Sequence, residues 1–191
     1  RGSLVVDIGG GTTEIDVLSL AGAVVSTSLR VAGDDMDEAI ISHLRRHHNL
    51  LIGEQSAEKI KLTLGTAWPM KEELAMEVKG RDSVSGLPRQ ATITSIEIRE
   101  ALSHPVRLIC EAIRGILEEA PPEIAADLYD SGVTMVGGGS LLLGLPDAVS
   151  DHLGLPARVG SEPLSAVARG TGIFLDKLDV FSKVLATEEV D

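Results

Sequence analysis

Three short apolar segments open the chain, and turn-forming residues separate them. The segments cover residues 4–8, 14–20 and 24–31, with a run of three glycines and an Ala-Gly turn between them. Short runs of aliphatic and β-branched residues between glycines favour strands over helices. We therefore expect a β-meander that leads into a helix.

Helical periodicity follows the three strands. The first helix is expected to open at Asp35, with Glu38 as the second member of a capping box, and to end near residues 47–49. A second helix is expected after Ser56, because apolar residues recur there at positions three and four apart.

Residues 68–94 have a different pattern from the helices before them. Short alternating stretches are interrupted at residues 80–82 and 85–88, which predicts hairpins in a small inserted subdomain. Thr94 and Glu97 then have the spacing of another capping box and predict the start of a long helix.

Helices and strands alternate in the rest of the chain. The expected elements are a kink or restart of the long helix at Pro105, a short helix after Pro121 and Pro122, a strand over 133–136, a helix over 145–153, a strand over 157–159 and a closing helix from Pro163 to Leu178. The last dozen residues are expected to fray.

The composition is that of a globular protein, with 43% hydrophobic and 24% charged residues among 191. A formal net charge of −12 gives no basic surface for nucleic acid, so we expect no nucleic-acid partner. Cys110 is the single cysteine and is expected to be buried in a reducing, cytoplasmic protein. No apolar run approaches the roughly 20 residues of a membrane-spanning helix, so membrane contact would have to come from another part.

The first glycine run follows a buried strand and precedes two hydroxyl side chains. It reads Asp7, Ile8, Gly9, Gly10, Gly11, Thr12, Thr13. Successive glycines leave backbone N–H groups free to surround a phosphate, and a carboxylate beside them can hold Mg²⁺ through water. The alternative is a glycine-rich β-turn with an unrelated acidic residue.

Two further features carry candidate chemistry. Gly137, Gly138 and Gly139 follow the strand at 133–136, either as a loop against a flat or anionic ligand or as a tight strand-to-helix turn. Glu58 and Lys61 lie three apart on the second helix. They form either a ledge for ribose hydroxyls and a purine edge or an exposed ion pair.

His43 and His47 have a spacing that can bind zinc, but no third ligand with suitable spacing is evident. The pattern favours polar histidines at a helix end, where an imidazolium is favourable to the helix dipole.

Taken together, the motifs resemble the C-terminal half of the MreB-type bacterial actins, filament-forming members of the actin and heat-shock-chaperone ATPase superfamily. The similar segments run from Leu4 to about Leu178: VDIGGGTTE at 6–14, GD at 33–34 with MDEAI at 36–40, IGE at 52–54, AEKIK at 57–61, GRD at 80–82, GLPR at 86–89, VGGGS at 136–140, PL at 163–164 and VARG at 167–170. The glycine loops are shared across the superfamily, whereas their combination in this order is specific to MreB-like proteins.

This resemblance implies ATP as the ligand, with Mg²⁺, and polymerisation coupled to the nucleotide. By position, Asp7 would organise Mg²⁺. The phosphate loop would be formed by Gly9, Gly10, Gly11, Thr12 and Thr13, and Thr12 would also orient the attacking water. Adenosine would be contacted by Glu58 and Lys61, and its base would be lined by Gly137, Gly138 and Gly139.

The implied fold is α/β, an actin-like (ribonuclease-H-like) nucleotide-binding lobe formed by residues 1–65 and 123–191, with a small α+β subdomain at 66–122 that makes filament contacts. The implied partners are further copies, stacked head to tail, and other cytoskeletal or cell-shape proteins. The implied role is rod cell shape; a specialised actin that positions an organelle, or a chaperone or sugar kinase on the same fold, is the alternative.

Two departures from the family pattern matter. The family's N-terminal lobe, which supplies a first phosphate loop, the acidic residue that activates water and a membrane-contacting segment, is not in this sequence. Half a cleft should bind nucleotide weakly and hydrolyse it negligibly, because phosphoryl transfer needs charge neutralisation from all sides. Asp16 stands where relatives usually carry a small or apolar residue.

Overall fold

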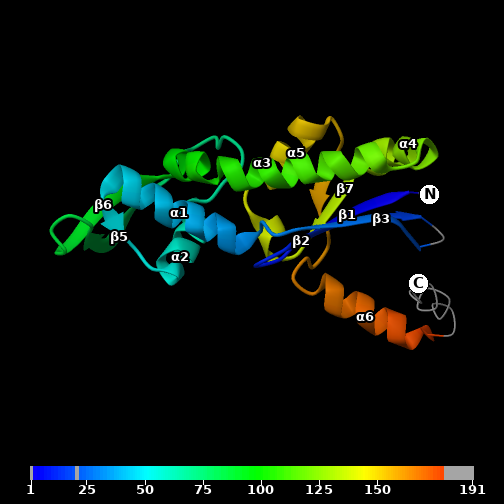
Figure 1. Cartoon of the computed structure of the whole chain (residues 1–191), viewed down its shortest axis with the longest axis horizontal. Helices are drawn as coiled ribbons and strands as arrows, with labels where there is room; N and C mark the ends of the chain where they lie inside the picture. Colours follow the sequence, from blue (N-terminus) through cyan, green and yellow to red (C-terminus); the bar gives the residue numbers. More distant parts are fainter. Residues whose placement is uncertain (1, 20–21, 179–191) are drawn as a thin grey trace.

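A computed structural model describes residues 2–19 and 22–178 of the chain. The molecule is elongated, with a β-hairpin at one end of its longest axis and the N-terminus at the other (Figure 1). The frayed segment expected at the C-terminus lies outside the described residues. Among the described helices, none is both long and apolar enough to cross a membrane.

A mixed five-stranded sheet forms the larger end. Its strands are β1 (Ser3–Ile8), β2 (Thr13–Ser19), β3 (Gly22–Leu29), β7 (Val133–Val136) and β8 (Ala157–Val159), in the order β3-β2-β1-β7-β8. The first three form the predicted antiparallel meander, whereas β1, β7 and β8 are parallel. Because β1 and β7 are parallel neighbours, the glycine runs that follow them leave the sheet at the same edge.

A second, antiparallel sheet contains β4 (Leu50–Leu51), β5 (Ala75–Asp82) and β6 (Pro88–Thr94). The expectation of several hairpins was wrong. A single hairpin forms, because β5 continues through Gly80 and Arg81, which pair with Arg89 and Pro88. The second sheet also takes in β4, from outside the 66–122 interval; the division into a lobe and an insertion stays a prediction.

Six α-helices and one 3₁₀ helix are found among the described residues. They are α1 (Gly33–His48), α2 (Glu54–Leu64), α3 (Ser95–Glu119), α4 (Pro122–Ser131), η1 (Gly138–Leu141), α5 (Leu145–Leu153) and α6 (Ala166–Asp176). Helix α3 joins the two ends of the molecule, since it packs against β2 and β3 of the first sheet and β6 of the second (Figure 1). Helix α3 is continuous through Pro105, so the helix does not restart at that residue.

Several helix starts differ from the sequence-based expectation. Helix α1 begins at Gly33, and Asp35 is its third residue: the Asp35 carboxylate accepts the N–H of Ala32 at 2.8 Å. Glu38 is therefore not part of that cap. Helix α2 begins at Glu54, two residues before Ser56.

The capping box of α3 is confirmed. The Glu97 carboxylate accepts the N–H of Thr94 at 2.9 Å, and the Thr94 hydroxyl accepts the N–H of Glu97 at 3.3 Å. This reciprocal pair satisfies two backbone donors that the first turn of a helix otherwise leaves open.

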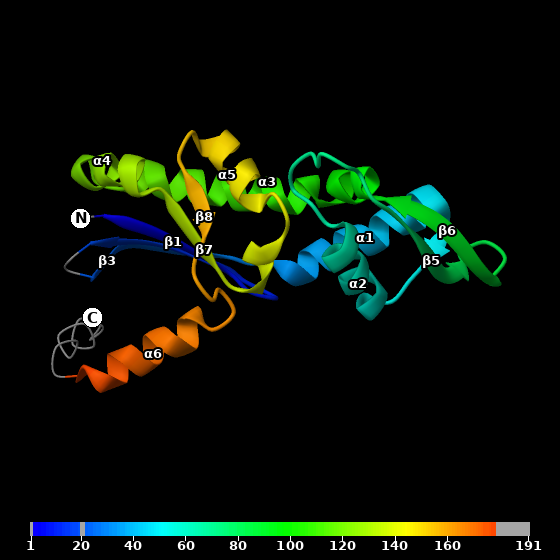
Figure 2. The same cartoon turned by 180° about the vertical axis from the view of Figure 1, so that it is seen from behind.

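The buried core extends from the five-stranded sheet, which α3 covers, to the packing of α1 against α2 and α3, and Cys110 is buried in it as expected, at 2% exposure. Burial raises the pKa of this thiol to about 11. Helix α6 is different: it begins at Ala166 instead of Pro163, has no buried residue and lies across the sheet from α3 (Figures 1 and 2).

Candidate functional site

The two glycine runs lie against each other at the edge of the sheet. Gly137 has φ +80°, and a Cβ there would lie 2.3 Å from Asp7 Oδ1 and 2.4 Å from the carbonyl oxygen of Ile8. At Gly139 a Cβ would lie 2.3 Å from Cγ2 of Ile8. Such distances exclude a side chain, so these glycines are required for the close approach of the loops.

The first glycine run is attached to the start of α1. Gly33 donates its N–H to the carbonyl of Gly9 at 3.1 Å, and Asp34 donates to the carbonyl of Gly10 at 2.8 Å. Glycine at position 10 is not required by packing, because a Cβ would stand 3.5 Å from the Asp34 carboxylate. This loop is therefore held at its carbonyls and remains open toward solvent.

A cavity of about 600 Å³ lies between the glycine runs and α2. Of the residues predicted for the site, Gly9, Gly10, Glu58, Lys61, Gly138 and Gly139 line it. Figures 1 and 2 both show the segment after β7 beside the start of α1, which accounts for this convergence. The lining combines charged side chains of α1 and α2 with leucines that include Leu141 and Leu143.

The other predicted residues lie beside the cavity without lining it. Gly11 and Thr12 are exposed at the β1–β2 turn, and Asp7 is half-buried against Gly137. Thr13 is fully buried, and its hydroxyl donates to the carbonyl of Val31 at 2.7 Å. The side chain of Thr13 is thus engaged in holding the end of β3 near β2.

Lys61 has a different partner from the one its local spacing suggested. Its Nζ donates to Asp37 Oδ2 at 2.9 Å and to the carbonyl of Gly33 at 3.0 Å. Both charged side chains are largely buried, at 16% and 15% exposure. The local Glu58–Lys61 ion pair is therefore not the interaction that the structure shows for Lys61 among the described residues.

Sequence reasoning missed Asp34 and Asp37, which line the cavity from α1. Their three-residue spacing places them on one helix face, the only local signal of a shared role. With Glu58 they make three carboxylates against the single ammonium of Lys61 in the lining. This wall is consequently negative and favours a cationic or cation-bridged ligand.

The environment of Asp37 opposes its ionisation. Burial raises the pKa of this carboxyl, the hydrogen bond and charge of Lys61 lower it, and the charges of Glu58 and Asp34 raise it again, so that the pKa is raised overall. Oδ1 is buried without a hydrogen-bond partner among the described residues. An aspartate kept at this position at such a cost is a functional candidate.

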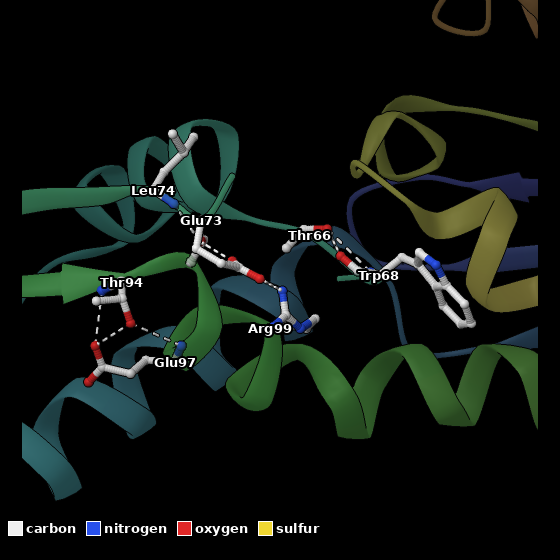
Figure 3. A network of polar contacts seen from close by, with 8 residues as sticks. Thr66, Trp68, Glu73, Leu74, Thr94, Glu97 and Arg99 are labelled. Carbon is white, nitrogen blue, oxygen red and sulfur yellow. Dashed lines mark hydrogen bonds and ion pairs between the residues drawn. The ribbon is translucent and has the colours of Figure 1, made fainter. Parts of the chain in front are cut away.

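The segment between α2 and β5 forms another wall of the cavity through Gly65, Met70 and Leu74. Its first part is fixed to the segment between η1 and α5, since Ala67 donates its N–H to the carbonyl of Leu143 at 2.8 Å. The Thr66 hydroxyl closes a turn by donating to the carbonyl of Trp68 at 2.6 Å (Figure 3).

The end of this segment is fixed to the first turn of α3 (Figure 3). Leu74 donates its N–H to the Ser95 hydroxyl at 2.8 Å, and Glu73 accepts from Ser95 at 2.5 Å and from Arg99 at 2.9 Å. The cavity wall is therefore tied to the helix that joins the two sheets.

The histidines of α1 do not form a metal centre, and no group of three potential ligand side chains that could hold a metal is found in the described ranges. His43 is 4% exposed and stacks on His47 with ring centroids 4.3 Å apart. Burial and the neighbouring His47 lower the pKa of His43. The expectation of polar histidines at a helix end was therefore wrong for His43, while His48 contacts Glu97 at 2.6 Å.

The fold is that of the actin-like proteins. A crystal structure of MreB 5 of Spiroplasma citri bound to AMPPNP superposes with a TM-score of 0.90 at 36% identity, covering 98% of this chain and 56% of that one. The MamK double helical filament structure gives a TM-score of 0.70 at 26% identity, covering 85% of this chain and 50% of that one.

The sequence comparisons narrow this class to one family. The family model described as MreB/Mbl protein matches residues 1–183. The cell shape-determining protein MreB of Escherichia coli (strain K12) is 46% identical over 188 residues, or 98% of this chain and 54% of that protein. The cell shape-determining protein Mbl of Bacillus subtilis (strain 168) is 44% identical over 182 residues, or 95% of this chain and 55% of that protein.

The chain belongs to the MreB/Mbl family of bacterial actins. It spans about half the length of the curated relatives that it matches.

Proposed function

We propose that this chain supplies one wall of an ATP site and takes part in a cytoskeletal filament that determines cell shape. The observation that carries the proposal is the cavity where both glycine runs and α2 meet. Its relatives include cell shape-determining proteins, and structures of a relative contain AMPPNP and ADP. These relatives favour a cell-shape actin over an organelle-positioning actin, a chaperone or a sugar kinase.

The cavity suits a nucleotide in size and in having both charged and apolar lining residues. About 600 Å³ falls within the common range for small-molecule sites. The purine would lie between Gly138, Gly139 and the leucines after them, the ribose beside Glu58 and Lys61, and the phosphates at Gly9 to Thr12.

Mg²⁺ is the cation that this negative wall would need beside a triphosphate. Within the described ranges the Asp7 carboxylate makes no hydrogen bond or ion pair. Mg²⁺ typically takes one or two carboxylates with water and phosphate oxygens. When bound, the ion would neutralise phosphate charge. Asp7 would orient it, and Thr12 would orient the attacking water. Gly10 and Gly11 would present backbone N–H groups, whereas the N–H of Gly9 donates to the carbonyl of Thr12 at 2.9 Å and shapes the loop.

ATP hydrolysis belongs, in this proposal, to the cleft completed by the other half of the family's fold. This wall contributes carboxylates and a single lysine to the lining, which is too little positive charge for a phosphoryl-transfer transition state. The chain alone should therefore bind ATP weakly and hydrolyse it negligibly. Membrane contact would come from the N-terminal half of a cytoplasmic protein.

The hairpin tip is the proposed filament contact at one end of the molecule (Figure 1). Val84 and Leu87 are 84% and 65% exposed there. Asp82 Oδ1 accepts the N–H groups of Val84 at 2.9 Å and Ser85 at 2.8 Å, and Oδ2 pairs with Arg89. The Ser85 hydrogen bond, followed by Arg89, holds the pKa of Asp82 well below its usual range. The tip is thus preorganised, which lowers the entropic cost of association.

The opposite end of the molecule complements the tip in charge. Glu118, Glu119 and Glu123 are exposed where α3 meets α4, and the last turn of α3 has no basic residue. Cations are normally favoured at that position by the helix dipole, so the acidic end is not explained by helix stability. The hairpin carries exposed Lys79 and Arg81, and a head-to-tail stack would bring the two ends together.

Calorimetric titration with ATP and Mg²⁺ tests the nucleotide site. Gly10→Asp places a second carboxylate beside Asp34 and should abolish binding. Gly115→Asp is a matched control, because Gly115 lies on α3 with open space around it. Equal affinity of wild type and Gly10→Asp would exclude the first glycine run as the phosphate site.

Charge exchange tests the filament contact in a sedimentation assay of the full chain. Arg81→Glu and Glu119→Lys should each reduce pelleting, and their combination should restore it. If the double variant does not recover pelleting, the filament contact lies elsewhere. The ATP affinity of the same variants is a separate measurement that reports on the cavity.

A further inference from the structure

Lys61 is the only cation that lines the cavity within the described ranges, and its surroundings control what it can bind. Two of its three N–H donors are used, one on Asp37 and one on the carbonyl of Gly33. One donor remains for a ligand. Because Asp37 neutralises the charge beside it, that donor acts as a hydrogen-bond donor more than as a free cation.

The same contacts join α2 to the first glycine run through the start of α1. Lys61 on α2 is bonded to the carbonyl of Gly33, and the N–H of Gly33 is bonded to the carbonyl of Gly9 at 3.1 Å. A Cβ at Gly33 would stand 3.2 Å from the Gly9 carbonyl oxygen and 3.6 Å from Lys61 Nζ, so the three groups are packed around one backbone position. The position of the lysine is thereby set relative to the first glycine run.

We propose that Asp37 is a positioning residue that holds Lys61 for the ribose and base end of the nucleotide and keeps it from acting as a phosphate ligand. This inference rests on the proposed ATP site. Without Asp37, the ammonium would regain an unpaired charge on a flexible four-carbon side chain. It would then bind an anion better and a neutral nucleoside worse.

The raised pKa of Asp37 agrees with a role in selecting the ligand and not in stabilising the fold. Burial, together with the carboxylates of Glu58 and Asp34, opposes the ionised form more than Lys61 favours it. A buried ion pair of this kind contributes little to folding and is retained for specificity in several systems. A purely structural residue would be expected to support both ligands of the cavity equally.

The experiment compares two ligands that represent the two ends of ATP. Affinities for adenosine and for pyrophosphate are measured by calorimetry for wild type, Asp37→Asn, Lys61→Met and the double variant. Asp37→Asn is nearly isosteric and should weaken adenosine binding about 10-fold while tightening pyrophosphate binding about 3-fold, the scale of one charge-assisted hydrogen bond.

A double-mutant cycle then shows whether Asp37 acts through Lys61. In the Lys61→Met background, Asp37→Asn should leave adenosine affinity unchanged and should raise pyrophosphate affinity less than in wild type. Glu38→Gln is the matched control, because it removes an exposed carboxylate from the same helix, α1, that does not line the cavity; it should leave adenosine affinity unchanged.

The possible failures are distinguishable. Equal weakening of both ligands by Asp37→Asn would indicate structural damage and overturn the inference, as would a full Asp37→Asn effect on adenosine in the Lys61→Met background. Both results leave the ATP site intact. Absence of wild-type binding to adenosine, pyrophosphate and ATP would instead overturn the proposed function and this inference with it.

Discussion

The two glycine runs have the same three residues in a row but different physical reasons for them. In the second run, Gly137 and Gly139 are in contact with the end of β1 so closely that a Cβ would lie 2.3 Å from another atom. In the first run, Gly10 has ordinary space around it. Packing against β1 therefore requires glycine at positions 137 and 139 but not at position 10. The proposed reason for glycine at position 10 is the approach of a phosphate to the backbone.

The largest effect is expected from Gly137→Ala. An alanine at φ +80° would be strained and would clash with Asp7 and with the Ile8 carbonyl, for a combined cost of about 3 kcal/mol. Urea denaturation measures this loss. Gly138→Ala is the matched control, because its Cβ would stand 3.5 Å from Leu164 and should change stability by less than about 0.5 kcal/mol. Similar losses for both variants would contradict the packing argument.

An intermediate loss of stability is expected from a change at the start of α3, away from both glycine runs. Glu97→Ala removes the α3 cap and the partner of His48, and should cost about 1 kcal/mol at neutral pH without changing ATP affinity. Its stability is compared with that of Glu100→Ala, an exposed neighbour outside the cap.

The pH dependence of the stability difference between wild type and Glu97→Ala gives a second test of the Glu97 contacts. Burial alone would raise the pKa of Glu97, but hydrogen bonds from His48 and Thr94 outweigh it and lower the pKa. A lowered carboxyl pKa contributes stability that is present above the ordinary glutamate range and lost as pH falls through the folded-state value. The gap between wild type and Glu97→Ala should therefore narrow on acidification; a gap that widens would contradict the assignment.

The smallest effect on stability is expected from Gly10→Ala. Its Cβ meets only the Asp34 carboxylate, at 3.5 Å, so the free energy of unfolding should change by less than about 0.5 kcal/mol. ATP affinity should nevertheless fall, because the methyl group lies where a phosphate would approach the backbone. A variant that unfolds as readily as Gly137→Ala would remove the distinction between the two runs.

Features coded by neighbouring residues were predicted well. The three opening strands, the capping box at Thr94 and Glu97 and the strand at 133–136 all depend on residues a few positions apart. The start of α1 was missed because Ala32, which has no polar side chain, precedes the helix, and the cap comes from Asp35 inside it.

Long-range contacts explain what the sequence did not reveal about the site. Glu58 and Lys61 were found from their spacing, but the partner of Lys61 is Asp37, 24 positions earlier. The different roles of the glycine runs likewise depend on the pairing of β1 with β7, which no local pattern encodes. Residues were thus identified more readily than their contacts.

The parallel pairing of β1 with β7 also has a consequence for synthesis of the protein. Leu4 pairs with Val133, so the edge of β1 stays open until the ribosome has added well over a hundred residues. At roughly 5–20 residues per second the delay is on the order of 10 s, long compared with the formation of the β1–β2–β3 meander. During that interval the nascent chain presents an unpaired apolar strand, a target for chaperones or for misassembly, and the ligand site becomes complete only after the second glycine run has left the ribosome.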